Sequence, residues 1–69
     1  MTTNKFLKEI DKIKFSLYYA VQDNLLTEYE FSAIITQILL AGHYHTSGQI
    51  DRLEYELDKI TRKLYIVTS

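Results

Sequence analysis

The side chains best suited to bind a metal ion are His43 and His45, which flank Tyr44 in a segment bounded by two glycines. Two imidazoles supply two ligands, whereas a structural zinc site takes four, and the chain has no cysteine. We therefore expect no metal and no cofactor. A solvated loop, or one whose Tyr44 docks on a neighbouring surface, accounts for this segment, and protonation of both imidazoles in mild acid would add positive charge to it.

The 69 residues contain no recognisable catalytic motif. There is no serine, histidine and acid arrangement with a nucleophile elbow, no glycine-rich phosphate loop and no His-Glu-x-x-His sequence. Glu28 and Glu30 fit the favourable negative charge at the start of a helix. A chain of this size also has little volume for a pocket that would bury a substrate. We predict that the protein is not an enzyme.

Basic residues near the C-terminus could contact phosphate groups. They are Arg52, Lys59, Arg62 and Lys63. Acidic residues crowd the start of the same segment, which is the part of a recognition helix that usually enters the major groove of DNA. We do not expect nucleic-acid binding. A small DNA-binding regulator that uses these basic residues stays as the alternative, with contacts sensitive to salt.

Helices must position these groups, because proline is absent and the two glycines, Gly42 and Gly48, lie in one short stretch. We expect one domain, 1–69, since 46% apolar and 25% charged residues are typical of a small globular protein. A first helix is predicted over 4–22, capped by Thr3 or Asn4. Its apolar residues recur every three or four positions, at Phe6, Ile10, Ile13, Leu17 and Ala20.

A second helix is predicted over 28–41, because Thr27 and Glu30 have the spacing of a capping box and Leu26 can pack on Phe31. Gly42 is expected to end it in the left-handed conformation, with a loop over 42–50. A third helix is predicted over 51–67, where Asp51 and Glu54 repeat the capping-box spacing. Its apolar residues are Leu53, Leu57, Ile60, Leu64 and Val67. The sequence therefore predicts an all-α protein, a compact three-helix bundle.

The second helix has an additional apolar strip opposite its core face, formed by Tyr29, Ala33 and Leu40. Two other helices cannot cover it on all sides. Below about 70 to 80 residues a single core seldom supplies more than ~3–5 kcal/mol, and no disulfide adds to it. We therefore expect self-association, with a dimer favoured, and Leu40→Glu is predicted to disperse the oligomer.

Two further groups of side chains lie away from the predicted core. Phe15 and Tyr19 are one turn apart on the outer side of the first helix, and Tyr55, Arg62 and Ile66 form a strip on the third. Aromatic residues with flanking charge often anchor interfaces. For Phe15 and Tyr19 the alternative is that the second helix or a loop folds over them.

One sequence pattern recurs at an offset of 24 residues. Asn24-x-Leu26-Thr27-x-x-Glu30-Phe31 matches Gly48-x-Ile50-Asp51-x-x-Glu54-Tyr55. A duplication would explain the match, and so would two independent capping boxes preceded by apolar residues. Residues 24–40, with a fainter copy at 48–64, resemble the SHOCT family of short helical domains. Asn24 stands where that family has glycine, and Ile35 where lysine is common. The resemblance implies a role in assembly or interaction.

Charge and hydropathy favour a cytoplasmic protein that does not enter a membrane. The start lacks a basic segment followed by a long apolar run. Residues 1–22 carry four lysines and two acids, 23–41 carry three acids and no base, and 42–69 carry four of each. We predict a small non-catalytic module that binds a larger protein as an inhibitor, adaptor or regulatory subunit, of the kind that phages and mobile elements encode.

Overall fold

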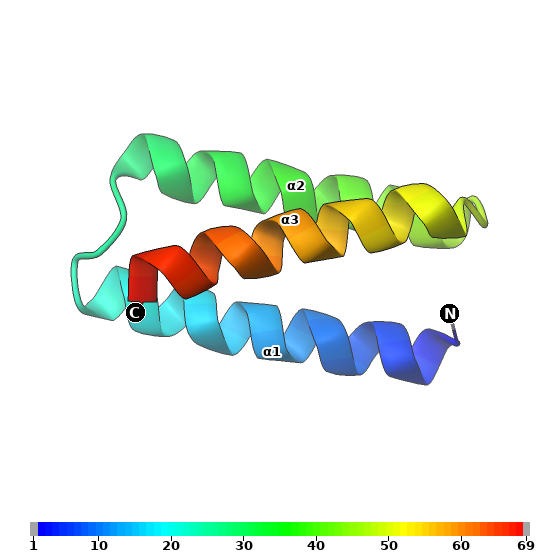
Figure 1. The fold of residues 1–69 in the computed structure, drawn as a ribbon, viewed down its shortest axis with the longest axis horizontal. Helices are drawn as coiled ribbons and strands as arrows, with labels where there is room; N and C mark the ends of the chain where they lie inside the picture. The colour runs from blue at the N-terminus through cyan, green and yellow to red at the C-terminus, as the bar shows by residue number, and fades with distance from the viewer. Residues whose placement is uncertain (1, 69) are drawn as a thin grey trace.

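The computed structural model describes residues 2–68, and it confirms the predicted three-helix bundle. The helices are α1 (Thr3–Gln22), α2 (Glu28–Thr46) and α3 (Ile50–Thr68). As Figure 1 shows, α1 and α3 run in the same direction and α2 runs opposite to both. Helix α3 is central: its contact with α2 is the most extensive, its contact with α1 comes next, and α1 and α2 touch least.

The core lies where α3 faces the other two helices. Its buried side chains are Ile10, Ile13 and Leu17 of α1, Ile34 and Ala41 of α2, and Leu53, Leu57, Ile60 and Leu64 of α3. The predicted seams of α1 and α3 therefore form the core, apart from Phe6 and Val67, which are half-buried, and Ala20, which is fully buried outside this cluster. Helix α2 contributes fewer buried side chains to this core than its apolar composition suggests. Phe31, expected on its core face, is 39% exposed, because α1 and α2 are in limited contact.

Helix α1 begins at Thr3, one residue earlier than expected. Thr2, rather than Thr3 or Asn4, is the N-cap, and its hydroxyl accepts a hydrogen bond of 3.2 Å from the backbone N–H of Lys5. At the other end Asn24 adopts a positive φ of 56°, and the N–H of Leu25 donates to the carbonyl of Ala20 at 2.9 Å. Asparagine tolerates this conformation, which satisfies the last carbonyl groups of a helix.

The start of α2 agrees with the prediction. The backbone N–H of Thr27 donates to Glu30 Oε1 at 3.0 Å, and the N–H of Glu30 donates to Thr27 Oγ1 at 3.1 Å. This capping box satisfies two of the backbone donors that a helix start leaves without intrahelical partners.

The predicted end of α2 is wrong. The helix continues through Gly42 to Thr46, so most of the segment expected to be a loop is helical. Gly48, with φ of +73°, takes the left-handed position, and the N–H of Gln49 donates to the carbonyl of Tyr44 at 2.9 Å. The extension is favourable because it packs Tyr44 against the core and stacks His45 on Phe6 of α1. A glycine inside a helix costs only about 1 kcal/mol relative to alanine.

The third helix begins at Ile50, so Asp51 lies in its first turn and does not occupy the predicted N-cap position. The connection from α2 is shorter than predicted, because α2 ends five residues later than expected. The two repeated sequence segments thus share a left-handed residue, Asn24 or Gly48, followed by a helix start. They differ in how that start is capped.

Candidate interaction surfaces

The predicted interface residues lie on the outer sides of all three helices. Seven are exposed and one, Ala33, is half-buried; the seven are Phe15, Tyr19, Tyr29, Leu40, Tyr55, Arg62 and Ile66. They do not converge on one site. The structure separates them into one group on α1, one on α2 and one on α3.

On α1, Phe15 and Tyr19 are 78% and 58% exposed. The alternative that another segment folds over them is therefore wrong for the single chain. Nearby, Lys12 pairs with Glu9 at 3.7 Å across one helical turn, and both side chains are partly solvated. This outer side of α1 presents an aromatic pair with charged neighbours.

On α2 the additional apolar strip is open to solvent. Tyr29 is 83% exposed and Leu40 is 39% exposed, and Ala33 lies half-buried between them along the helix. Leu39 is 70% exposed and was not among the predicted interface residues. The sequence could have predicted this exposure, because Leu39 lies away from the side of the helix that Ile34 and Ile38 share.

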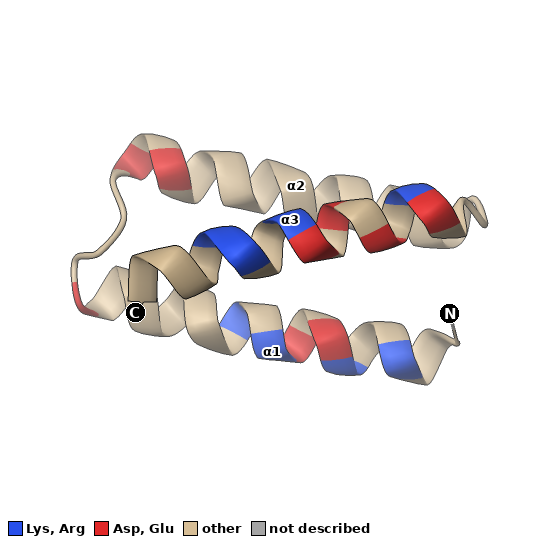
Figure 2. Ribbon diagram, in the orientation of Figure 1, with Lys and Arg blue, Asp and Glu red and all other residues tan. Residues whose placement is uncertain are grey.

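On α3 the predicted residues occur among local ion pairs. Arg62 Nε lies 3.0 Å from Asp58 Oδ2, and Lys59 Nζ lies 3.8 Å from Glu56 Oε1 and 5.3 Å from the centre of the Tyr55 ring. Figure 2 shows that blue and red segments follow one another along α3. This surface has mixed charge, with Ile66 near its C-terminal end.

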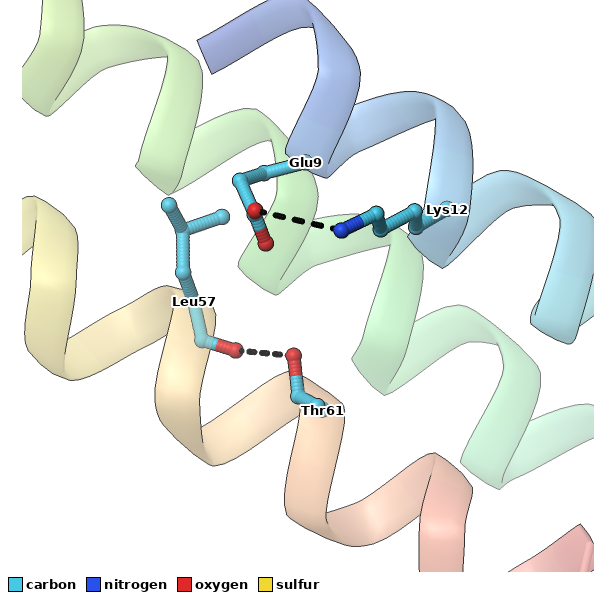
Figure 3. Close-up of polar contacts among 4 residues, drawn as sticks. All are labelled: Glu9, Lys12, Leu57 and Thr61. Carbon is cyan, nitrogen blue, oxygen red and sulfur yellow. Dashed lines mark hydrogen bonds and ion pairs between the residues drawn. The ribbon is translucent and has the colours of Figure 1, made fainter. Parts of the chain in front are cut away.

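Two depressions border these groups. One is shallow and apolar and is lined by Thr61, Arg62, Tyr65 and Ile66 of α3. The other is a groove between α1 and α3, lined by Glu9, Lys12, Ile13, Ser16, Thr61, Leu64, Tyr65 and Thr68. Figure 3 shows polar groups at this groove with partners on their own helices: Glu9 pairs with Lys12, and the Thr61 hydroxyl donates to the carbonyl of Leu57 at 2.8 Å.

The two histidines belong to α2 and not to a loop. Successive residues of a helix are about 100° apart, so His43 and His45 point to different sides. His43 is exposed, whereas the His45 ring stacks on Phe6 of α1, with ring centres 4.2 Å apart and planes within 2°. Between Thr2 and Thr68, no group of three or more His, Cys, Asp or Glu residues gathers as metal ligands would.

Comparisons of the chain with models of protein families, with curated proteins and with solved structures return no match. The SHOCT resemblance stays a prediction from the sequence. Within residues 2–68, none of the three helices combines the length and the apolarity that crossing a membrane requires.

Proposed function

We propose that this chain is a non-catalytic protein-protein interaction module, which self-associates and occupies a surface of a larger protein as an inhibitor, adaptor or regulatory subunit. The observation that carries the proposal is the exposure of large apolar side chains on every helix. Phe15, Tyr29 and Ile66 are each more than 70% exposed in a chain whose whole accessible surface is 5060 Å². Exposed apolar residues in such number are typical of surfaces that bind protein.

The charges of α3 favour this proposal over a DNA-binding regulator. Arg62 contacts Asp58 and Lys59 contacts Glu56, so these two of the four cations on α3 already have an acid beside them. A surface of alternating sign gains little from the release of counterions by a phosphate backbone. The cytoplasmic location stays a prediction of the sequence.

Sedimentation equilibrium tests the proposed self-association. We expect a dimer for the natural sequence and a monomer for Leu40→Glu, with circular dichroism verifying that the variant keeps its helices. An unchanged mass for the folded variant would exclude Leu40 from the contact.

Capture of a host protein tests the proposed second partner. The tagged chain should retain one host protein specifically, and Phe15→Glu or Tyr55→Glu should release it while leaving the fold intact. Retention of a DNA duplex at about 50 mM salt, abolished by Lys59→Glu with Arg62→Glu, would instead support the regulator.

A further inference from the structure

The outer side of α2 is uncharged over most of its length. From Phe31 to Ile50 the sequence has no Asp, Glu, Lys or Arg, and Figure 2 shows α2 coloured only at its first turn. Six residues make up what we call the α2 stripe, all of them exposed: Tyr29, Ser32, Thr36, Leu39, Leu40 and His43. They share the side of α2 that faces away from the core residue Ile34.

Side-chain size changes along the α2 stripe in a way that fits a second copy of the same helix. Small residues, Ser32 with the adjacent Ala33, lie just before Thr36, and Leu39 and Leu40 lie just after it, while Tyr29 and His43 stand at the two ends. When two such helices run antiparallel about Thr36, Leu39 and Leu40 lie level with Ala33 and Ser32 of the second copy. A twofold axis brings together residues at similar angles about the Thr36 side of each helix, so Leu39 packs beside Ser32 and Leu40 beside Ala33, each about 1.5 Å out of level.

The polar groups of α2 are compatible with the same arrangement. The Thr36 hydroxyl donates to the carbonyl of Ser32 at 3.0 Å, so its donor is already satisfied when the stripe loses water. Antiparallel pairing also places the acidic first turn, with Glu28 and Glu30, beside the last turn of the second copy, with His43 and His45. This arrangement sets opposite ends of the two helix dipoles side by side. A parallel pair would set the acidic turns against each other.

We propose that two copies of this chain pair through the α2 stripe, with their α2 helices antiparallel and a twofold axis beside Thr36. This inference rests on the proposed self-association and specifies its surface. A contact made by one helix from each copy lies at the lower end of specific interface sizes, below about 1,200 Å² in total. We therefore expect a dissociation constant in the micromolar range.

Cysteine cross-linking tests the geometry sharply, because the chain has no cysteine of its own. Thr36→Cys should form a disulfide-linked dimer rapidly, since a residue at a twofold axis meets its own copy. Ser32→Cys is the matched control on the same side of α2. Its two copies would lie eight residues apart along antiparallel helices, about 12 Å, which is beyond the reach of a disulfide. The double variant Ser32→Cys with Leu39→Cys should regain the cross-link, because these two positions lie on the same side of the antiparallel contact and about 1.5 Å out of level.

Each outcome decides the inference. Cross-linking at Thr36 and in the double variant, but not at Ser32 alone, supports it. Equal cross-linking at Thr36 and Ser32 would indicate parallel helices and overturn it. A dimer in sedimentation that Thr36→Cys does not link would overturn the α2 surface and leave the proposed self-association standing. A natural chain that is monomeric up to about 500 µM, well above a micromolar dissociation constant, would overturn both.

A pair of charge variants gives an independent measurement. Leu39→Glu with Leu40→Glu places two acids on the α2 stripe and should raise the dissociation constant at least tenfold. Phe15→Glu adds an acid at a similarly exposed position on α1 and should leave the constant within twofold. A larger effect of Phe15→Glu than of the double variant would contradict pairing through α2.

Discussion

Glu30 is the residue whose ionisation is tied most clearly to its local structure. Its carboxylate accepts a hydrogen bond from the backbone N–H of Thr27, which is the main reason that the pKa of Glu30 lies below the ordinary value of 4.5. The Thr27 hydroxyl lowers this pKa further, and the charge of Lys63 on α3 adds a smaller effect in the same direction.

A lowered pKa in the folded chain means that the ionised Glu30 stabilises the fold above the pKa of the unfolded chain. This contribution is lost as the pH falls through the folded value. We expect Glu30→Gln to lower the melting temperature at pH 7 and to have little effect at about pH 3. Thermal melts at the two pH values check this, and an equal difference at both would contradict the role of the charge.

Glu56 is a buried carboxylate on α3 without full hydrogen bonding. Its Oε1 lies 3.8 Å from Lys59 Nζ, and within residues 2–68 its buried Oε2 has no hydrogen-bond partner. Replacing a poorly satisfied buried charge by an apolar side chain of similar size is often stabilising. Glu56→Leu should therefore raise the free energy of unfolding by about 1–3 kcal/mol, as urea denaturation would measure. Glu54→Leu on the exposed side should change it by less than ~0.5 kcal/mol.

Helices α1 and α2 are each followed by a residue in the left-handed conformation. Of the two glycines, only Gly48 takes this position. Gly42 lies within α2, and a Cβ added there would meet nothing within 4 Å. Gly48 has φ of +73° and ends the helix, so a side chain there is strained whatever the surrounding space.

Alanine at each glycine should have opposite effects. Gly42→Ala removes a flexible residue from a helix interior and should raise the free energy of unfolding by about 0.5–1 kcal/mol. Gly48→Ala should lower it by about 1 kcal/mol, because alanine is disfavoured at positive φ. Chemical denaturation of both variants measures the contrast, and a loss of stability in Gly42→Ala would show that α2 does not continue through this position.

At the scale of the whole molecule, α3 is the helix against which both other helices pack. Ile60 on α3 is fully buried, whereas Ile66 on the same helix is 72% exposed. Ile60→Val should lower the free energy of unfolding by about 0.5–1.5 kcal/mol, since it removes one buried methylene group. Ile66→Val should change it by less than ~0.5 kcal/mol in the monomer. Equal losses, measured at a concentration where the chain is monomeric, would contradict the central place of Ile60.

The same packing explains why apolar surface remains outside. Helix α2 faces α3 closely and α1 only slightly, so a helix with apolar residues on most sides has only part of its surface covered. In a chain with 5060 Å² of accessible surface, Tyr29 and Leu39 are left among the exposed residues. Association through the α2 stripe would remove both from water.

Local signals determined much of this fold from the sequence by itself. The three-helix architecture, the capping box of Thr27 and Glu30, and the seams of α1 and α3 follow from spacing and capping chemistry, which act between residues close in the chain. These interactions hold whatever the rest of the molecule does. For the same reason the sequence located Phe15 and Tyr29 outside the core.

Only the tertiary structure decided which of two glycines ends α2 and how much of α2 is covered. The packing of Tyr44 on the core favours continuation through Gly42, and that contact joins residues far apart in the sequence. The stacking of His45 on Phe6 and the exposure of Phe31 and Leu39 likewise depend on how closely α1 approaches α2. Periodicity shows which side of a helix is apolar, but the distance between helices decides which of those apolar residues lose contact with water.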